Sequence, residues 1–190
     1  MRAIKYYIPN FLTLLRVGLI PLMLAAFLYL PQPINHYYAG FIFAISAVTD
    51  LFDGYLARKY HAVSPLGAFL DPVADKLLVC TSLMIILLSH PSKLIIIATI
   101  IIICREITLL ALREWMAHVG KSNLMKVLFI AKFKTCTQMV SIVVLMIRYN
   151  DLSIMLAEIG FIVATGLTLY SMIEYLQIAA KDLTFFSQQT

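Results

Sequence analysis

The chain has 190 residues, of which 62% are hydrophobic and only 13% are charged. Soluble domains carry about 25% charged residues, and a soluble fold of this composition would expose a large apolar patch. The mean hydropathy of +0.90 therefore predicts an integral membrane protein with one domain over residues 1–190. In such a protein the net charge of +5 reports membrane topology, so no nucleic-acid partner is expected.

Apolar stretches of about 20 residues predict transmembrane helices. The first stretch follows Arg2 and Lys5 and resembles a signal peptide, but Arg16 interrupts it and no small-residue cleavage site follows. An uncleaved helix is therefore the better interpretation. The predicted spans cover residues 10–30, 37–58, 68–89, 93–117, 125–147 and 152–179. Turn residues separate them at Pro31–Pro33, Ser64–Gly67, His90–Pro91, Gly120–Asn123 and Asn150–Asp151.

The expected fold class is thus an all-α integral membrane protein with six transmembrane helices. With both termini on one side, thirteen of the fifteen lysines and arginines fall on that side, and only Lys93 and Arg148 fall on the other. The positive-inside rule then places the termini and the loop after the second span in the cytoplasm. The three cysteines lie in apolar runs without paired spacing, so neither a zinc site nor a disulfide is expected.

Four of the ten acidic residues fall within the 26 positions from Asp50 to Asp75. Asp50 and Asp53 are three residues apart on one helix, and Asp71 and Asp75 are four apart on the next, so each pair shares a helix face. At an effective dielectric near 20, like charges 4–6 Å apart repel by about 3–4 kcal/mol. Four converging carboxylates therefore require protonation or bound cations.

Carboxylate oxygens favour Mg²⁺, Mn²⁺ or Ca²⁺ over zinc, and a carboxylate cluster that keeps water positions suits Mg²⁺ bridging substrate phosphates. Gly54 and Ala57 lie beside the aspartates with almost no side chain. They would let a nucleotide or phosphate approach the backbone, although helix packing in a membrane explains small residues equally well.

The residues Asp50, Asp53, Gly54, Ala57, Arg58, Gly67, Asp71 and Asp75 fit the pattern D-x2-D-G-x2-A-R-x8-G-x3-D-x3-D at every fixed position. This pattern resembles the signature of the CDP-alcohol phosphotransferase family, whose six-helix core has about the length of this chain. Members transfer a substituted phosphate from a CDP-linked donor to an alcohol and release CMP.

The resemblance implies that Asp50, Asp53, Asp71 and Asp75 hold two divalent metal ions, Mg²⁺ or Mn²⁺, against the donor diphosphate. Asp75 would also be the general base. Asn10, Thr13 and Arg16 resemble the family's N-x2-T-L-x-R segment near the nucleotide, although a snorkelling Arg16 at a helix end explains that match nearly as well. The expected CDP-donor contacts are therefore Asn10, Thr13, Gly54, Ala57, Arg58 and Gly67.

A second basic region follows the aspartates. Arg105 and Arg113 lie eight residues apart on one predicted helix, about 80° around its axis, so both could face one site. Because a cation within a span is costly, an anionic ligand would offset that cost, and for Arg105 pairing with Glu106 is the alternative. An acceptor that carries a phosphate fits, whereas positive-inside decoration explains Lys121 and Lys126 equally well. The predicted acceptor-phosphate contacts are Arg105, Arg113, Lys126, Lys132, Lys134 and Gln138.

The segment from Arg105 to Gln138 is similar to bacterial phosphatidylglycerophosphate synthases, except that Ala131 stands where glycine is usual. That similarity implies CDP-diacylglycerol and sn-glycerol 3-phosphate as substrates, CMP as a product, membrane lipids as surroundings and a homodimer as the assembly. It also implies a multi-pass protein of the bacterial inner membrane with its site facing the cytoplasm. The alternatives are the same chemistry on phosphatidylglycerol, serine or inositol phosphate, a prenyl transferase with aspartate-rich motifs, and a cation transporter.

Overall fold

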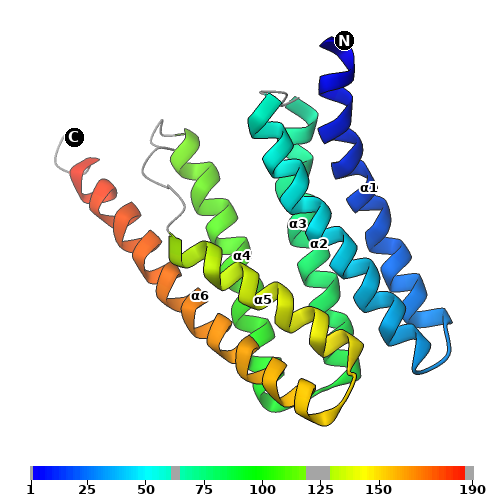
Figure 1. Cartoon of the computed structure of the whole chain (residues 1–190). Helices are drawn as coiled ribbons and strands as arrows, with labels where there is room; N and C mark the ends of the chain where they lie inside the picture. Colours follow the sequence, from blue (N-terminus) through cyan, green and yellow to red (C-terminus); the bar gives the residue numbers. More distant parts are fainter. Residues whose placement is uncertain (1, 61–64, 119–128, 187–190) are drawn as a thin grey trace. The chain divides into compact units, whose positions relative to one another are not determined.

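The computed structural model is all-helical in the part of the chain that it describes, residues 2–60, 65–118 and 129–186, with side chains described for 13–50, 70–118 and 134–177. Its helices are α1 (Arg2–Tyr29), α2 (Ile34–Tyr60), α3 (Pro65–Ser89), α4 (Lys93–His118), α5 (Phe129–Ile147) and α6 (Asp151–Phe186) (Figure 1). Each of the six predicted spans therefore corresponds to a helix.

Three segments are long and apolar enough to cross a membrane, namely Leu70–Ser89, Lys93–His118 and Asp151–Gln177. Thr13–Tyr29 and Lys134–Ile147 are shorter apolar helical segments within the described residues. The chain is thus a helical membrane protein, as its composition predicts.

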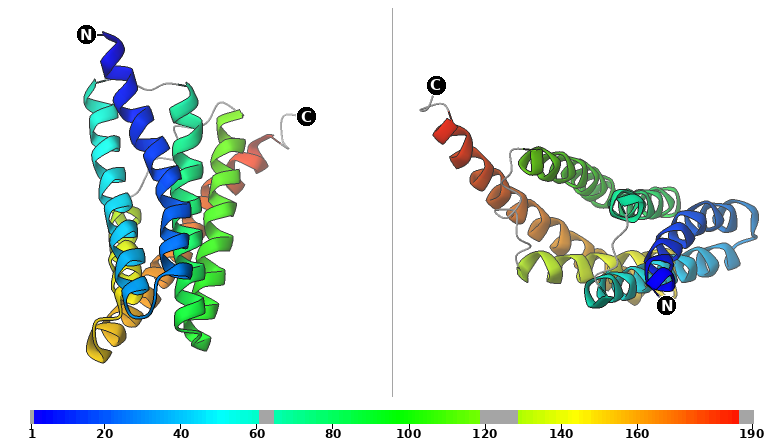
Figure 2. Two further views of the ribbon diagram at one scale, coloured as in Figure 1. Left: turned by 90° about the vertical axis from the view of Figure 1, so that its right-hand side faces the viewer. Right: turned by 90° about the horizontal axis from the view of Figure 1, so that it is seen from above.

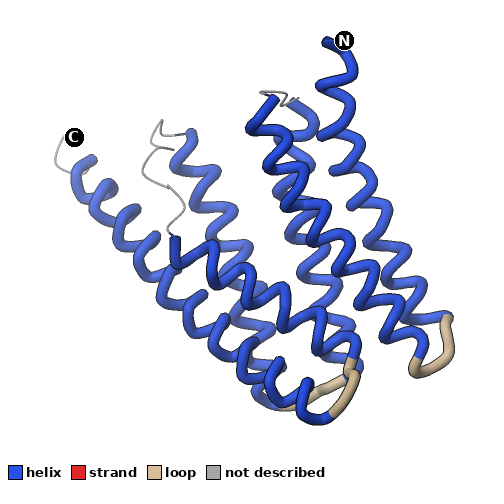
Figure 3. Tube along the Cα trace, viewed as in Figure 1, coloured by secondary structure: helices blue, strands red, loops and turns tan. Residues whose placement is uncertain are grey.

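The helix ends follow local capping chemistry. At the start of α6, the Ser153 amide donates to Oδ1 of Asn150 at 2.7 Å, and the Asn150 amide donates to Oγ of Ser153 at 3.1 Å. This reciprocal arrangement satisfies two amides that lack helical partners. At the start of α4, Oγ of Ser92 accepts the amide of Ile95 at 3.2 Å. The described loops between helices are short (Figure 3).

The boundary predicted at the start of the third span is wrong. The turn expected at Ser64–Gly67 is already helical from Pro65, which opens α3. Proline suits a first helical position because its missing N–H has no helical partner there and its fixed φ is close to the helical value. The predicted turn at Gly120–Asn123 lies outside the described residues.

Residue contacts group the chain into two units. Unit 1 comprises Met1–Pro91 with Ile142–Met155, and unit 2 comprises Ser92–Ser141 with Leu156–Thr190. In unit 1, α1 packs beside α2 and α3 (Figure 2). Its apolar core includes the buried side chains of Met23, Phe43 and Leu78.

In unit 2, a smaller apolar cluster joins α4 to α6. It consists of Leu109, Met116 and Tyr175, with Leu112 packed against them. Within each unit, packing of these apolar side chains sets which polar residues of neighbouring helices face one another.

Candidate active site

The aspartates of unit 1 lie around a buried arginine from α1. Arg16 has no solvent exposure, and its Nη2 lies 2.8 Å from Oδ1 of Asp50 on α2. Its Nη1 donates a hydrogen bond of 3.0 Å to Oδ1 of Asp71 on α3. One planar guanidinium therefore ties α2 at Asp50 to α3 at Asp71, a geometry that a lysine ammonium could not copy.

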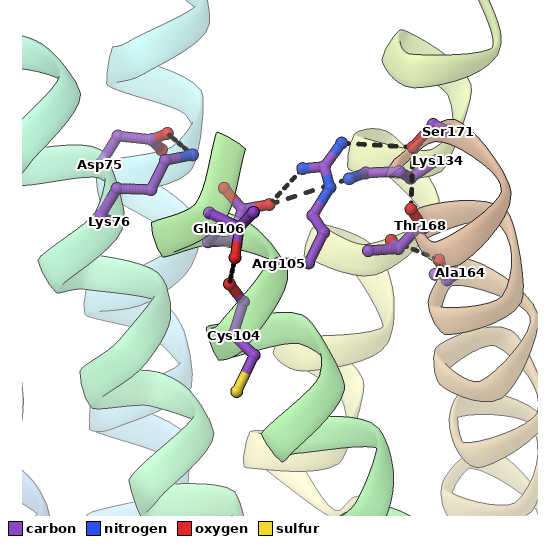
Figure 4. Close-up of polar contacts among 10 residues, drawn as sticks. Asp75, Lys76, Cys104, Arg105, Glu106, Lys134, Ala164, Thr168 and Ser171 are labelled. Carbon is purple, nitrogen blue, oxygen red and sulfur yellow. Dashed lines mark hydrogen bonds and ion pairs between the residues drawn. The ribbon is translucent and has the colours of Figure 1, made fainter. Parts of the chain in front are cut away.

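The other two carboxylates predicted for this cluster are Asp53 and Asp75. Asp75 lies one turn after Asp71 on α3, and its Oδ2 accepts a hydrogen bond of 3.4 Å from Nζ of Lys76 (Figure 4). Asp50 interacts electrostatically with both Asp71 and Asp75, so these three carboxylates lie within electrostatic range of one another. Asp53 lies in α2, but its side chain is outside the described residues.

Among the described side chains of this cluster, the charges do not cancel. Three described carboxylates face two described cations, Arg16 and Lys76, which leaves one net negative charge. The donor atoms are all carboxylate oxygens, the ligand type that Mg²⁺ and Mn²⁺ prefer. Among the described side chains, no group of three or more acidic, histidine or cysteine residues is close enough to hold a metal ion, and the fourth predicted ligand is not among them.

Sequence reasoning undervalued Arg16. A snorkelling arginine keeps its guanidinium in water, whereas this one is fully buried and ion-paired. The available signal was an arginine within an apolar run of a chain whose acidic residues are concentrated in one segment. Thr13, one turn before Arg16 on α1, is also buried and has a polar partner.

The remaining predicted donor contacts fall partly outside the described side chains. Asn10 lies in α1, Gly54, Ala57 and Arg58 in α2, and Gly67 in the first turn of α3. No side-chain contact is described for any of these five residues, so their roles stay predictions.

A second polar cluster lies in unit 2, among α4, α5 and α6. Nη1 of Arg105 donates to Oε1 of Glu106 at 2.6 Å, and Nζ of Lys134 lies 3.8 Å from the same oxygen (Figure 4). All three residues are buried. Among these three residues two cations share one carboxylate, and in an apolar setting such an excess of positive charge favours an anionic ligand.

The second cluster also contains a residue that sequence reasoning missed. Nη2 of Arg105 donates to Oγ of Ser171 on α6 at 3.2 Å. Ser171 is fully buried, and nothing in its sequence neighbourhood distinguishes it from an ordinary helix serine.

The other predicted acceptor contacts are differently placed. Gln138, one turn after Lys134 on α5, is buried. Arg113 is exposed, and its guanidinium carbon lies 5.9 Å from the centre of the Tyr175 ring. Lys126 lies outside the described residues, and Lys132 lies in α5 with an undescribed side chain.

Comparison with known proteins identifies relatives of this chain. Three relatives carry the name CDP-diacylglycerol–glycerol-3-phosphate 3-phosphatidyltransferase. The protein from Haemophilus influenzae is 45% identical over 179 residues, covering 94% of this chain and 96% of its own length. The one from Escherichia coli strain K12 is 44% identical over 180 residues, covering 94% and 98%. The one from Wigglesworthia glossinidia brevipalpis is 42% identical over 176 residues, covering 93% and 96%.

The model of the CDP-alcohol phosphatidyltransferase family matches residues 6–170, a range that includes every predicted site residue. The family expected from the eight-residue pattern is thereby confirmed: the chain belongs to the CDP-alcohol phosphatidyltransferase family.

Proposed function

We propose that this protein transfers the phosphatidyl group from CDP-diacylglycerol to sn-glycerol 3-phosphate, giving phosphatidylglycerophosphate and CMP. The observation that carries the proposal is the aspartate cluster of unit 1, in which Arg16 holds Asp50 and Asp71 together. The shared name of three relatives that match almost end to end supports the choice of substrates.

Asp50, Asp71 and Asp75, together with Asp53, would hold two divalent metal ions. The fit rests on donor chemistry, because an all-oxygen set with more carboxylates than cations among its described side chains suits Mg²⁺ or Mn²⁺. When bound, such a pair supplies charge stabilisation to the attacking and leaving oxygens of an in-line displacement. Arg16 keeps two of the carboxylates in register throughout.

Asp75 is the proposed general base. Its side chain is 29% exposed, so an acceptor hydroxyl can reach it, whereas a fully buried carboxylate would be closed to substrate. In the reaction the acceptor oxygen forms a bond to the phosphatidyl phosphorus while its proton passes to Asp75. The bond between that phosphorus and the bridging oxygen breaks, and CMP leaves.

Donor and acceptor would be held by different residues. Asn10, Thr13, Gly54, Ala57, Arg58 and Gly67 are proposed to contact the cytidine diphosphate part of the donor. The acceptor phosphate would bind Arg105 and Lys134, where the unit 2 cluster has excess positive charge. Guanidinium and ammonium groups suit a phosphate because they supply charge-assisted hydrogen bonds. Gln138, Arg113, Lys126 and Lys132 complete the proposed acceptor set.

We further propose that all six helices cross the bacterial inner membrane and that two chains form a homodimer. The loop after the second span, between the two pairs of aspartates, would face the cytoplasm. The lysine and arginine distribution supports the orientation, since thirteen of fifteen fall on the proposed cytoplasmic side. On that side a soluble acceptor has direct access to the loop.

A panel of acceptors tests the proposal. Purified protein in mixed micelles with CDP-diacylglycerol and Mg²⁺ is given glycerol 3-phosphate, phosphatidylglycerol, serine or inositol phosphate, and CMP release is measured. Glycerol 3-phosphate alone should support release, and chelation of the metal should abolish it. Release with another acceptor only would move the protein to another branch of the family.

The variant Asp75→Asn tests the proton-transfer role separately. It should lose CMP release while still binding the donor, because asparagine keeps the shape of aspartate but cannot accept the proton. Near-normal turnover in this variant would remove Asp75 from the role of base.

A further inference from the structure

Ser171 is a polar residue on α6 to which the proposed reaction assigns no role. It is fully buried, and it joins α6 to the charged cluster by accepting a hydrogen bond of 3.2 Å from Nη2 of Arg105. Its own hydroxyl donates to the backbone oxygen of Thr168 at 2.9 Å (Figure 4). The residue therefore stands between the α6 backbone and the guanidinium.

The direction of these two hydrogen bonds is fixed. A serine hydroxyl has one hydrogen and two lone pairs, and the hydrogen is committed to Thr168. Toward Arg105 the Ser171 oxygen can only accept, which matches a guanidinium that can only donate. Ser171 thus restrains the arginine without cancelling any of its charge, whereas Glu106 on Nη1 restrains it and does cancel charge.

Arg105 is consequently held at both terminal nitrogens, while its Nε–H stays unused. Only 7% of the residue is exposed, and Nε has no hydrogen-bond partner among the described residues. A buried donor without a partner is unfavourable. The unclaimed Nε–H, together with the two cations that share the single carboxylate of Glu106, indicates an anion as the missing partner.

We propose that Ser171 is a positioning residue for the acceptor: it fixes the Arg105 guanidinium so that Nε and the remaining N–H groups meet the phosphate of the acceptor. This inference rests on the proposed function. Without Ser171, the long arginine side chain would regain rotamer freedom and Nη2 would lose a neutral acceptor. The acceptor would then have to order the guanidinium as it binds, which weakens its binding.

Four variants test the role of Ser171 in the intact protein, with KM measured separately for glycerol 3-phosphate and CDP-diacylglycerol. Ser171→Ala removes the oxygen, and Ser171→Cys replaces it with a weakly accepting sulfur of similar shape. Ser171→Thr keeps the hydroxyl. Ser82→Ala is the matched control, because Ser82 on α3 is also fully buried and donates to a backbone oxygen three residues earlier, that of Val79, at 2.7 Å.

Loss of one hydrogen bond to a charged group predicts a rise in the KM for glycerol 3-phosphate on the order of tenfold in Ser171→Ala and Ser171→Cys. Their KM for CDP-diacylglycerol should change less than about twofold, whereas Ser171→Thr and Ser82→Ala should resemble the wild type. If Ser171→Ala does not fold, the Ser171→Cys variant gives the same test.

An unchanged KM for glycerol 3-phosphate, or an equal rise for both substrates, would overturn the positioning role and leave Ser171 as a packing residue. A wild-type protein that makes no product from glycerol 3-phosphate is a different outcome, because it refutes the proposed function on which the inference rests.

Discussion

The contact between Arg16 and two aspartates makes a quantitative prediction about coupling. Replacing Arg16 with glutamine removes the guanidinium from a site with no solvent exposure and leaves Asp50 and Asp71 facing each other across unit 1. Because the two carboxylates remain 32% and 47% exposed at their side chains, water relieves part of their repulsion.

The size of the effect lies between two limits. At an effective dielectric near 20, charges about 3 Å apart attract by roughly 5–6 kcal/mol before desolvation is subtracted. Fully exposed pairs retain only about 0.2–1 kcal/mol, and breaking fully buried pairs costs about 3–5 kcal/mol. We therefore expect about 1–2 kcal/mol of coupling between Arg16 and Asp71. Coupling to Asp50 should be larger, since that contact is shorter and less exposed.

A double-mutant cycle measures this coupling. The variants Arg16→Gln, Asp71→Asn and their combination are unfolded with sodium dodecyl sulfate in mixed micelles, and the free energies of unfolding are compared. The control cycle combines Asp71→Asn with Arg148→Gln. Arg148 donates to the backbone oxygen of Ser89, which lies about 27 Å from Asp71 along α3, so that cycle should be additive. Coupling below about 0.5 kcal/mol between Arg16 and Asp71 would refute the proposed counter-ion role.

Three further predictions concern pH, packing and metal. Burial, and then the charge of Arg148, lowers the pKa of His36 from its usual 6.5. The unfolded chain therefore binds a proton at His36 more readily than the folded chain does. The free energy of unfolding should keep its full value above pH 6.5 and fall as the pH drops below 6.5. His36→Gln should flatten this pH dependence of the unfolding free energy. A Cβ at Gly40 would lie 2.7 Å from Cγ1 of Ile147, whereas one at Gly18 would meet nothing within 4 Å. Gly40→Ala should thus cost about 1–3 kcal/mol in chemical denaturation, and Gly18→Ala should not destabilise. Removing divalent metal should lower the melting temperature of wild-type protein but change that of an Asp50→Asn/Asp71→Asn variant much less, as measured by differential scanning fluorimetry.

Helix positions were predictable from sequence because apolar runs of span length leave few alternatives for the backbone. Helix ends were less predictable, since they depend on single capping residues. Asn150 caps the start of α6 by accepting the Ser153 amide, at the turn where a new helix was predicted to begin. Pro65, in contrast, was predicted to lie in a loop, but it opens α3. Proline marks a turn and also a first helical turn, and the sequence alone did not separate the two.

The charged residues divide in the same way. The spacing of Asp50 with Asp53, and of Asp71 with Asp75, predicted that each pair shares one helix face. The pairing of Arg105 with Glu106 could be predicted because the two residues are adjacent in the sequence. Contacts between distant helices were not. Arg16 is 55 residues from Asp71, and Ser171 is 66 residues from Arg105, so neither partnership has a local pattern that could reveal it.

The central claim is tested most directly by offering purified protein all four acceptors in one mixture, with CDP-diacylglycerol and Mg²⁺, and identifying the lipid products by mass spectrometry. We predict phosphatidylglycerophosphate in an amount equal to the CMP released, and none of either in an Asp75→Asn preparation treated in parallel. A phosphatidyl product on serine, inositol phosphate or phosphatidylglycerol in place of glycerol 3-phosphate would contradict the account.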